Sequence, residues 1–217
     1  MTTMEPGGTR ATIGEQCRDL GRLSTQGELG SSIARIMKSY SLRHIRQLIQ
    51  GFSRKLADLD PVYRTRITEK VTEHLHGTWH TIRLMEQPGA FGRMEVPLPS
   101  SAGLFWEMVT HECDDAVPDR NPRLRFLKYL LGAFSMLVLL EPAHPAGTPF
   151  PGGESVEYVE GTYYCPVRER ANEVGGALCP FCPALQTPDG SKLTSPYTAS
   201  EYRRQQFISH YYQNYNG

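Results

Sequence analysis

The sequence lacks any excess of charge of one sign. The 217-residue chain carries 23 basic and 23 acidic residues, so its formal net charge is zero. A neutral chain has no general attraction to nucleic acid or anionic lipid, and a function of that kind would need a local basic patch. The first twenty residues also lack the apolar core of a signal peptide, which predicts a cytoplasmic protein.

Long hydrophobic runs are absent as well. The most apolar segment is 124–140, in which Arg125 and Lys128 interrupt the hydrophobic residues. About twelve uncharged positions remain, whereas a helix that spans a bilayer needs about twenty. We therefore expect a buried core helix that Pro142 stops, and no membrane association.

Motifs of nucleophilic and phosphate chemistry are missing too. No G-x-S-x-G sequence occurs, and the segment "FPGGES" at 150–155 is not followed by the Lys-Ser/Thr pair of a phosphate-binding loop. Gly152 and Gly153 are better explained as a bend before a hairpin. The sequence therefore assigns no catalytic residue, and it leaves open whether the protein is an enzyme.

Helical periodicity is present over most of the first 141 residues. Residues 42–56 have apolar side chains at spacings of three and four after the N-cap residue Ser41. A second well-marked helix begins at Asp60-Pro61 and ends before Pro88. Both patterns predict amphipathic helices of a bundle.

The remaining N-terminal segments are less regular. The chain reads as helical from Ala11, with a break near Gly27 and Gly30. Residues 88–102 are rich in Pro, Gly and Ser, which predicts a loop. We expect about five helices in this part of the chain.

The composition changes after Pro142, where prolines and glycines become too frequent for a helix. Val156 and Tyr163 flank a Glu160-Gly161 turn, which predicts a short β-hairpin. The fold class is therefore mainly α, a helical bundle with a small Cys-rich metal-binding module. The expected parts are a flexible tail (1–10), the bundle (11–141), the module (142–198) and a C-terminal helix packed on the rest (199–217).

Three of the five cysteines lie in the predicted module. Cys179 and Cys182 have the Cys-x-x-Cys spacing, at which one tight turn aims two sulfurs at a metal about 2.3 Å from each. Cys165 follows the hairpin and would be a third ligand. These thiols predict a structural zinc site.

A closed zinc site needs a fourth ligand. His144 is favoured because its loop leads directly into the hairpin that ends at Cys165. Cys113 is an alternative that would give four thiolates and allow an iron–sulfur cluster, and His111 is a third possibility. A redox dithiol and thiols without a metal also remain open for the Cys-x-x-Cys pair. Cys17 lies on an apolar stripe and reads as a packed thiol.

The segments "HPAGTPFPGG", "YYCPVRER" and "ALCPFCPALQ" together resemble an uncharacterised protein family of archaea, mostly methanogens, known only as a domain of unknown function. The resemblance covers roughly residues 35–187. It implies a cytosolic archaeal protein whose His144 loop, Cys165, Cys179, Cys182 and Gln186 belong to one structural unit. It implies no activity, fold or substrate.

A second cluster of metal-ligand residues lies in the helix that begins at Pro61. Glu73, His76 and His80 fall at spacings of three and four and share one face, in the form used by carboxylate-bridged metal sites. No matching Glu-x-x-His stands on another helix, so a solvated face is the simpler interpretation. The run "THECDD" at 110–115 could likewise be an acid/base or metal-binding knot, or a polar helix end.

The segment 31–57 contains basic residues and no acidic one. Arg43, Arg46 and Arg54 stand opposite the apolar stripe of their helix and could contact phosphates. We expect a metal-binding protein that acts as a binding or interaction protein, with a protein partner or a second copy as its target. The alternatives are a metalloenzyme or iron–sulfur redox protein, or a nucleic-acid-binding protein that uses this basic helix.

Overall fold

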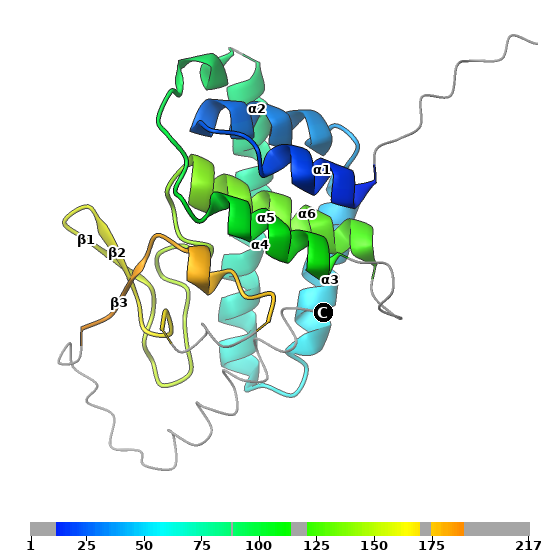
Figure 1. Ribbon diagram of the computed structural model, residues 1–217. Coiled ribbons are helices and arrows are strands. Elements are labelled where there is room, and N and C mark those ends of the chain that lie inside the picture. The colour runs from blue at the N-terminus through cyan, green and yellow to red at the C-terminus, as the bar shows by residue number, and fades with distance from the viewer. Residues whose placement is uncertain (1–11, 88, 114–120, 170–174, 189–217) are drawn as a thin grey trace, which may run out of the picture.

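The structure is a computed structural model that describes residues 12–87, 89–113, 121–169 and 175–188 (Figure 1). Within these residues six α-helices precede a three-stranded sheet, which confirms the mainly helical fold and adds one helix to the number expected. The helices are α1 (Ile13–Leu20), α2 (Gln26–Met37), α3 (Leu42–Lys55), α4 (Pro61–Glu86), α5 (Ala102–Glu112) and α6 (Pro122–Ala133). The predicted tail 1–10 and helix 199–217 lie outside the described residues.

Side-chain caps fix where the helices begin. Thr12 and Thr25 each form a capping box, with Glu15 and Glu28 respectively, at the start of α1 and α2. Each box satisfies amide hydrogens that have no partner inside the helix. The Asp60 carboxylate accepts the Tyr63 amide at 2.9 Å, so the predicted start of α4 is confirmed.

The predicted break near Gly27 and Gly30 is wrong, because both glycines lie inside α2. They serve close packing instead. A Cβ atom at Gly27 would lie 2.1 Å from the carbonyl oxygen of Phe91, in the 3-10 helix η1 (Ala90–Arg93). The expected loop 88–102 therefore contains this short helix. In the same loop, the Met94 carbonyl oxygen accepts the Gly27 amide at 2.9 Å.

The core of the bundle is built around α6 and its continuation. The segment η2 (Phe134–Val138) has π-helical hydrogen bonding, and all five of its residues are buried. In Figure 1, α5 and α6 cross in front of α4, the longest helix, while α1 and α2 lie above them. The buried core helix predicted for 124–140 is confirmed, and no helix among the described residues is long and apolar enough to cross a membrane.

The predicted hairpin is confirmed. β1 (Glu157–Val159) pairs antiparallel with β2 (Thr162–Cys165), and Tyr158 lies opposite Tyr163. Glu160 and Gly161 form the turn, with φ values of 49° and 83°. A third strand, β3 (Leu185–Gln186), pairs parallel with β2 and was not predicted.

The sheet and the cysteine segment pack directly on the bundle. Leu178 lies over Gly132 of α6, where a Cβ atom would be 3.0 Å from the leucine Cδ1 atom. The rings of Phe181 and Phe105 meet edge-on, with centroids 5.2 Å apart. One hydrophobic core thus includes residues from both parts of the chain.

Candidate metal centre

The pairing of β2 with β3 brings the predicted cysteines to one end of the small sheet. Cys165 is the last residue of β2 and lies opposite Gln186. Cys179 begins the 3-10 helix η3 (Cys179–Phe181), and the amide of Cys182 donates to the Cys179 carbonyl oxygen at 3.1 Å. The Cys-x-x-Cys turn therefore comes just before the strand that pairs with Cys165.

Backbone amides point at two of the sulfurs. The Val167 amide donates a hydrogen bond to the sulfur of Cys165. The amides of Ala184 and Ala143 donate to the sulfur of Cys182. In both turns one donor lies two residues beyond the cysteine, because the residue between them is a proline and has no amide hydrogen. Such donors favour the thiolate, which is the form that binds metals.

Burial works against the thiolate. It raises the pKa of Cys165 to about 12, and the nearby Cys179 and Cys182 thiols add to the increase. Burial also raises the pKa of Cys182. In the absence of a further cation, Cys165 and Cys182 are therefore neutral thiols at neutral pH.

Arg168 is the charged residue of the cluster. Its Nε atom donates to the carbonyl oxygens of Ala184 at 3.1 Å and of Cys182 at 3.3 Å. Its positive charge also lowers the pKa of the Cys165 and Cys182 thiols, in part offsetting their burial. This arginine was not predicted as part of the site, although it stands three residues after the first cysteine in "CPVRER".

Gln186 joins the two cysteine turns. Its Nε2 atom donates to the Pro166 carbonyl oxygen at 3.1 Å, and its Oε1 atom accepts the Glu169 amide at 3.0 Å. These bonds hold the segment after the first cysteine against the strand that follows the Cys-x-x-Cys turn.

The thiols are neighbours, but they do not form a completed ligand set. In the part of the chain that the structure describes, no group of three or more His, Cys, Asp or Glu side chains is arranged to hold a metal ion. The arrangement is a cluster of interacting thiols, and backbone amides donate hydrogen bonds to two of their sulfurs. To bind a metal, the sulfurs would have to close around it.

His144 lies in a different environment from that predicted for the fourth ligand. Its buried ring meets Phe150 edge-on, with centroids 5.7 Å apart. Burial lowers the pKa of His144 to about 4, and the nearby His74 of α4 contributes. Burial likewise lowers the pKa of His74 to about 4. The structure thus pairs His144 with a histidine from the apolar side of α4, while the preceding amide, that of Ala143, contacts Cys182.

The two alternative fourth ligands lie at the end of α5. Burial raises the pKa of Cys113 to about 12, and the neighbouring thiol that adds to the increase is Cys17 of α1. Cys17 is itself buried, with its pKa raised to about 11, so the predicted packed thiol is confirmed. His111 is exposed on the last turn of the helix.

A buried ion pair follows the same helix end. Glu112 lies 3.6 Å from the guanidinium of Arg125. Burial, with the charge of Arg125, lowers the pKa of the neighbouring Lys128 to about 7. Of the run 110–115, Glu112 is therefore engaged with Arg125, and Asp114 and Asp115 lie outside the described residues.

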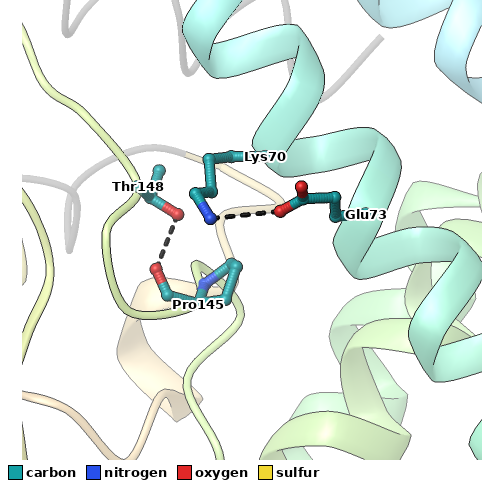
Figure 2. Close-up of polar contacts among 4 residues, drawn as sticks. All are labelled: Lys70, Glu73, Pro145 and Thr148. Carbon is teal, nitrogen blue, oxygen red and sulfur yellow. Dashed lines mark hydrogen bonds and ion pairs between the residues drawn. The ribbon is translucent and has the colours of Figure 1, made fainter.

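Glu73, His76 and His80 do not converge. Glu73 pairs with Lys70 at 3.1 Å, on the side of α4 that faces the Thr148 loop (Figure 2). His76 and His80 instead line a pocket between α3 and α4. In the described part of the chain, these side chains form no metal-binding group.

The basic side chains of α3 are on the surface. Arg43, Arg46 and Arg54 are all exposed. A contact with nucleic acid through this helix stays a prediction.

These elements define a class of mainly helical proteins in which a small sheet carries clustered cysteines beside a helical bundle. A family model described as "Uncharacterized protein conserved in archaea (DUF2115)" matches residues 25–187, most of the chain. The chain belongs to this family. The resemblance drawn from the sequence is therefore confirmed, and it begins at residue 25 instead of residue 35.

The relatives come from methanogens. A UPF0305 protein of Methanopyrus kandleri is 38% identical over 85 residues, which cover 39% of this chain and 59% of the relative. A UPF0305 protein of Methanothermobacter thermautotrophicus is 52% identical over 48 residues, 22% of this chain and 31% of its own length. Another match from that organism is 33% identical over 91 residues, 41% of this chain and 56% of the relative. Each alignment spans less than two thirds of the relative, and no solved structure matches the chain.

Proposed function

We propose that the protein binds a structural zinc ion through Cys165, Cys179 and Cys182. The observation that supports this most is the shared environment of the thiols, since Cys165 interacts with the other two and backbone amides are directed at two of the sulfurs. A divalent cation would stabilise all three thiolates at once, at sulfur–metal distances of about 2.3 Å.

The size of the module gives a physical reason for a metal. Its three strands have three, four and two residues. Strands of this length form a sheet that is too small to be stable alone. Metal binding would add its free energy to the folding of such a segment.

Metal content tests the proposal directly. We expect about one zinc per chain, the stoichiometry of a closed structural site, in untagged protein purified under reducing conditions and analysed by mass spectrometry of the elements. Cys182→Ser should lower the zinc content strongly. Cys17→Ser is the matched control, because it changes a buried thiol of the bundle and should leave zinc in place. Zinc-free wild-type protein, or equal zinc in both variants, would contradict the proposal.

An iron–sulfur cluster is the alternative cofactor. Protein purified without oxygen would then be brown and absorb visible light. We expect colourless protein, and a brown preparation with iron and acid-labile sulfide would replace zinc by a cluster.

His144 is our proposed fourth ligand, because the Ala143 amide already contacts Cys182. The ring would have to turn away from Phe150 to reach the sulfurs. His144→Ala should weaken zinc binding in a chelator competition. His74→Ala is the control, since it removes the neighbouring half-buried imidazole and should keep zinc. Equal zinc affinity of the two variants would show that the fourth ligand is another group.

We place the binding role on the same module. Tyr158, Val159 and Leu185 are exposed by 57%, 47% and 54%, and all three residues of β1 are exposed. β1 is an edge strand of the sheet, and an exposed edge strand can pair with another chain. A second copy of the chain is the partner we propose. Sedimentation should show self-association that Val159→Lys removes and that Val62→Lys, at an exposed valine of α4, leaves intact. A monomeric wild-type protein would contradict this role.

A further inference from the structure

A pocket of about 590 Å³ opens between the start of α3 and the C-terminal half of α4. Pockets that bind small molecules have volumes of about 300–1,000 Å³. None of the cysteines lines it, so it is separate from the candidate metal centre. His76 and His80 line this pocket, and neither belongs to a metal-binding group among the described residues.

Two buried aromatic rings form the floor of this pocket. Tyr40 and Trp79 are only 7% and 6% exposed. The Tyr40 hydroxyl donates to the Arg123 carbonyl oxygen at 3.1 Å, which fixes the ring. The guanidinium of Arg123 lies 5.2 Å from the Tyr40 ring centre, and that of Arg83 lies 5.9 Å from the Trp79 ring. The floor is therefore apolar and held in place, and of the two arginines Arg83 is the one that also lines the pocket.

Nitrogen donors line the wall on α4. His76, His80 and Arg83 are spaced by four and three residues, so they lie on one face of the helix. No carboxylate of the described residues lines the pocket. Among the residues that the structure describes, Arg83 forms no ion pair, and Glu86 on the next turn is paired with Lys38 at 2.7 Å. The positive charge of Arg83 is thus not neutralised by a neighbouring side chain of the described chain.

The opposite wall is supplied by the start of α3. Ser41 places a hydroxyl at the pocket, and its amide and hydroxyl oxygen lie 3.0 and 3.1 Å from Nδ1 of His44. Leu42 adds an apolar side chain that is 44% exposed. One wall therefore offers the Arg83 guanidinium and two imidazoles, and the other a hydroxyl beside an apolar surface.

We propose that this pocket binds a small organic phosphate monoester. A phosphate presents several anionic oxygens, which match the planar fork of Arg83 and the imidazole and hydroxyl donors around it. The apolar floor and Leu42 would contact the organic part of the ligand. Among the described residues, no carboxylate lines the pocket and Arg83 forms no ion pair, so the pocket favours an anion over a cation.

Calorimetric titration with adenosine 5′-monophosphate tests this assignment on the full-length protein. We expect saturable binding that Arg83→Gln weakens about tenfold or more, because a charge-assisted hydrogen bond is lost. His80→Gln should weaken it to a smaller degree. Inorganic phosphate should bind more weakly than the nucleotide, since it lacks contacts with the aromatic floor.

Arg66→Gln is the matched control. It removes the same charge from an exposed position of the same helix, outside the pocket, and should leave binding unchanged. Absence of binding at millimolar nucleotide would overturn the proposal. So would equal losses in the Arg66 and Arg83 variants, which would indicate general electrostatic attraction. Thermal melting of each variant verifies that it is folded.

A chelator separates direct anion binding from metal-mediated binding. His76 and His80 are four residues apart, a spacing at which two imidazoles can hold one metal ion. We expect the affinity for the nucleotide to be the same with and without EDTA. Loss of binding in EDTA would show that a metal on the histidines carries the ligand, which would overturn direct recognition by Arg83.

Discussion

The helical bundle and the cysteine module are ordered in different ways. In the bundle, long helices bury a continuous apolar core, and η2 with its five residues lies wholly inside. In the module, strands of two to four residues are held by side-chain bonds from Arg168 and Gln186 to the main chain. Hydrophobic packing therefore stabilises the bundle. The stability of the module depends instead on polar bonds, on its docking to the bundle and, as we propose, on a metal.

The two regions meet at a small number of specific contacts. Phe181 packs against Phe105, and the Tyr129 hydroxyl of α6 donates to the Gly176 carbonyl oxygen at 3.0 Å. Substitutions on the bundle side of this interface should therefore lower the free energy of unfolding more than substitutions on the module side. This difference can be measured.

The largest effect should come from Phe105→Ala. Phe105 is fully buried and contacts the rings of Trp106, Tyr129 and Phe181. We expect a loss of about 3–5 kcal/mol in the free energy of unfolding. Phe181→Ala, on the half-buried partner, should cost less and should mainly increase hydrogen exchange in the module. Equal costs in urea denaturation would show that the two regions do not differ in this way.

A lower pH should weaken the contact between the module and α4, where His144 lies near His74. Burial lowers the pKa of His74 and His144 to about 4 in the folded protein, while an unfolded histidine has a pKa of about 6.5. The unfolded chain therefore takes up protons first, and stability falls as the pH decreases from about 6.5 to about 4, by a loss on the order of 1–3 kcal/mol.

Replacing His74 should reduce this pH dependence and leaves the proposed zinc ligand His144 in place. His74→Gln should have a flatter profile of unfolding free energy between pH 7 and 4. His111→Gln, at an exposed histidine, should keep the wild-type slope. An unchanged slope in His74→Gln would show that His74 is not kept neutral in the folded protein.

Gly176→Ala tests the docking contact without removing a side chain. Gly176 has a φ of 70°, and a Cβ atom there would lie 2.6 Å from Cδ of Glu112. We expect a loss of about 1–3 kcal/mol from backbone strain and this clash. Gly51→Ala is the control, since a Cβ atom at that helical glycine meets nothing within 4 Å. A neutral result for Gly176→Ala in thermal unfolding would mean that the contact does not hold the module.

The smallest effect on stability should come from the basic face of α3. Arg43→Ala and Arg46→Ala change exposed side chains, so stability should stay within about 0.5 kcal/mol of the wild type. A variant that carries both substitutions tests the nucleic-acid hypothesis. This hypothesis predicts that the wild type is retained on RNA or DNA in a salt-dependent way and that the variant is not. Equal retention of both proteins would remove that hypothesis.

Local signals made the bundle predictable. Asp60-Pro61 marked the start of α4, the spacing of apolar residues located α3, and the apolar run 124–140 located α6. Gly27 and Gly30 misled the prediction, because their role is close packing against Phe91, a contact distant in sequence. A capping box at Thr25, which the sequence also contains, would have indicated the correct start of α2.

The candidate site was predictable only in part. The Cys-x-x-Cys spacing and the hairpin marked the cysteines, since both are local patterns. The two-residue strand β3, the bonds of Arg168 and the pairing of His144 with His74 arise from tertiary contacts that no local pattern encodes.

X-ray absorption at the zinc edge tests the central claim most directly, because it counts the sulfur ligands of the bound metal. For the wild-type protein we predict three sulfur atoms at about 2.3 Å and one lighter ligand. Cys182→Ser should lose metal, or lose one sulfur from the shell. A zinc bound only by nitrogen and oxygen, or a fully folded module without metal, would contradict the account.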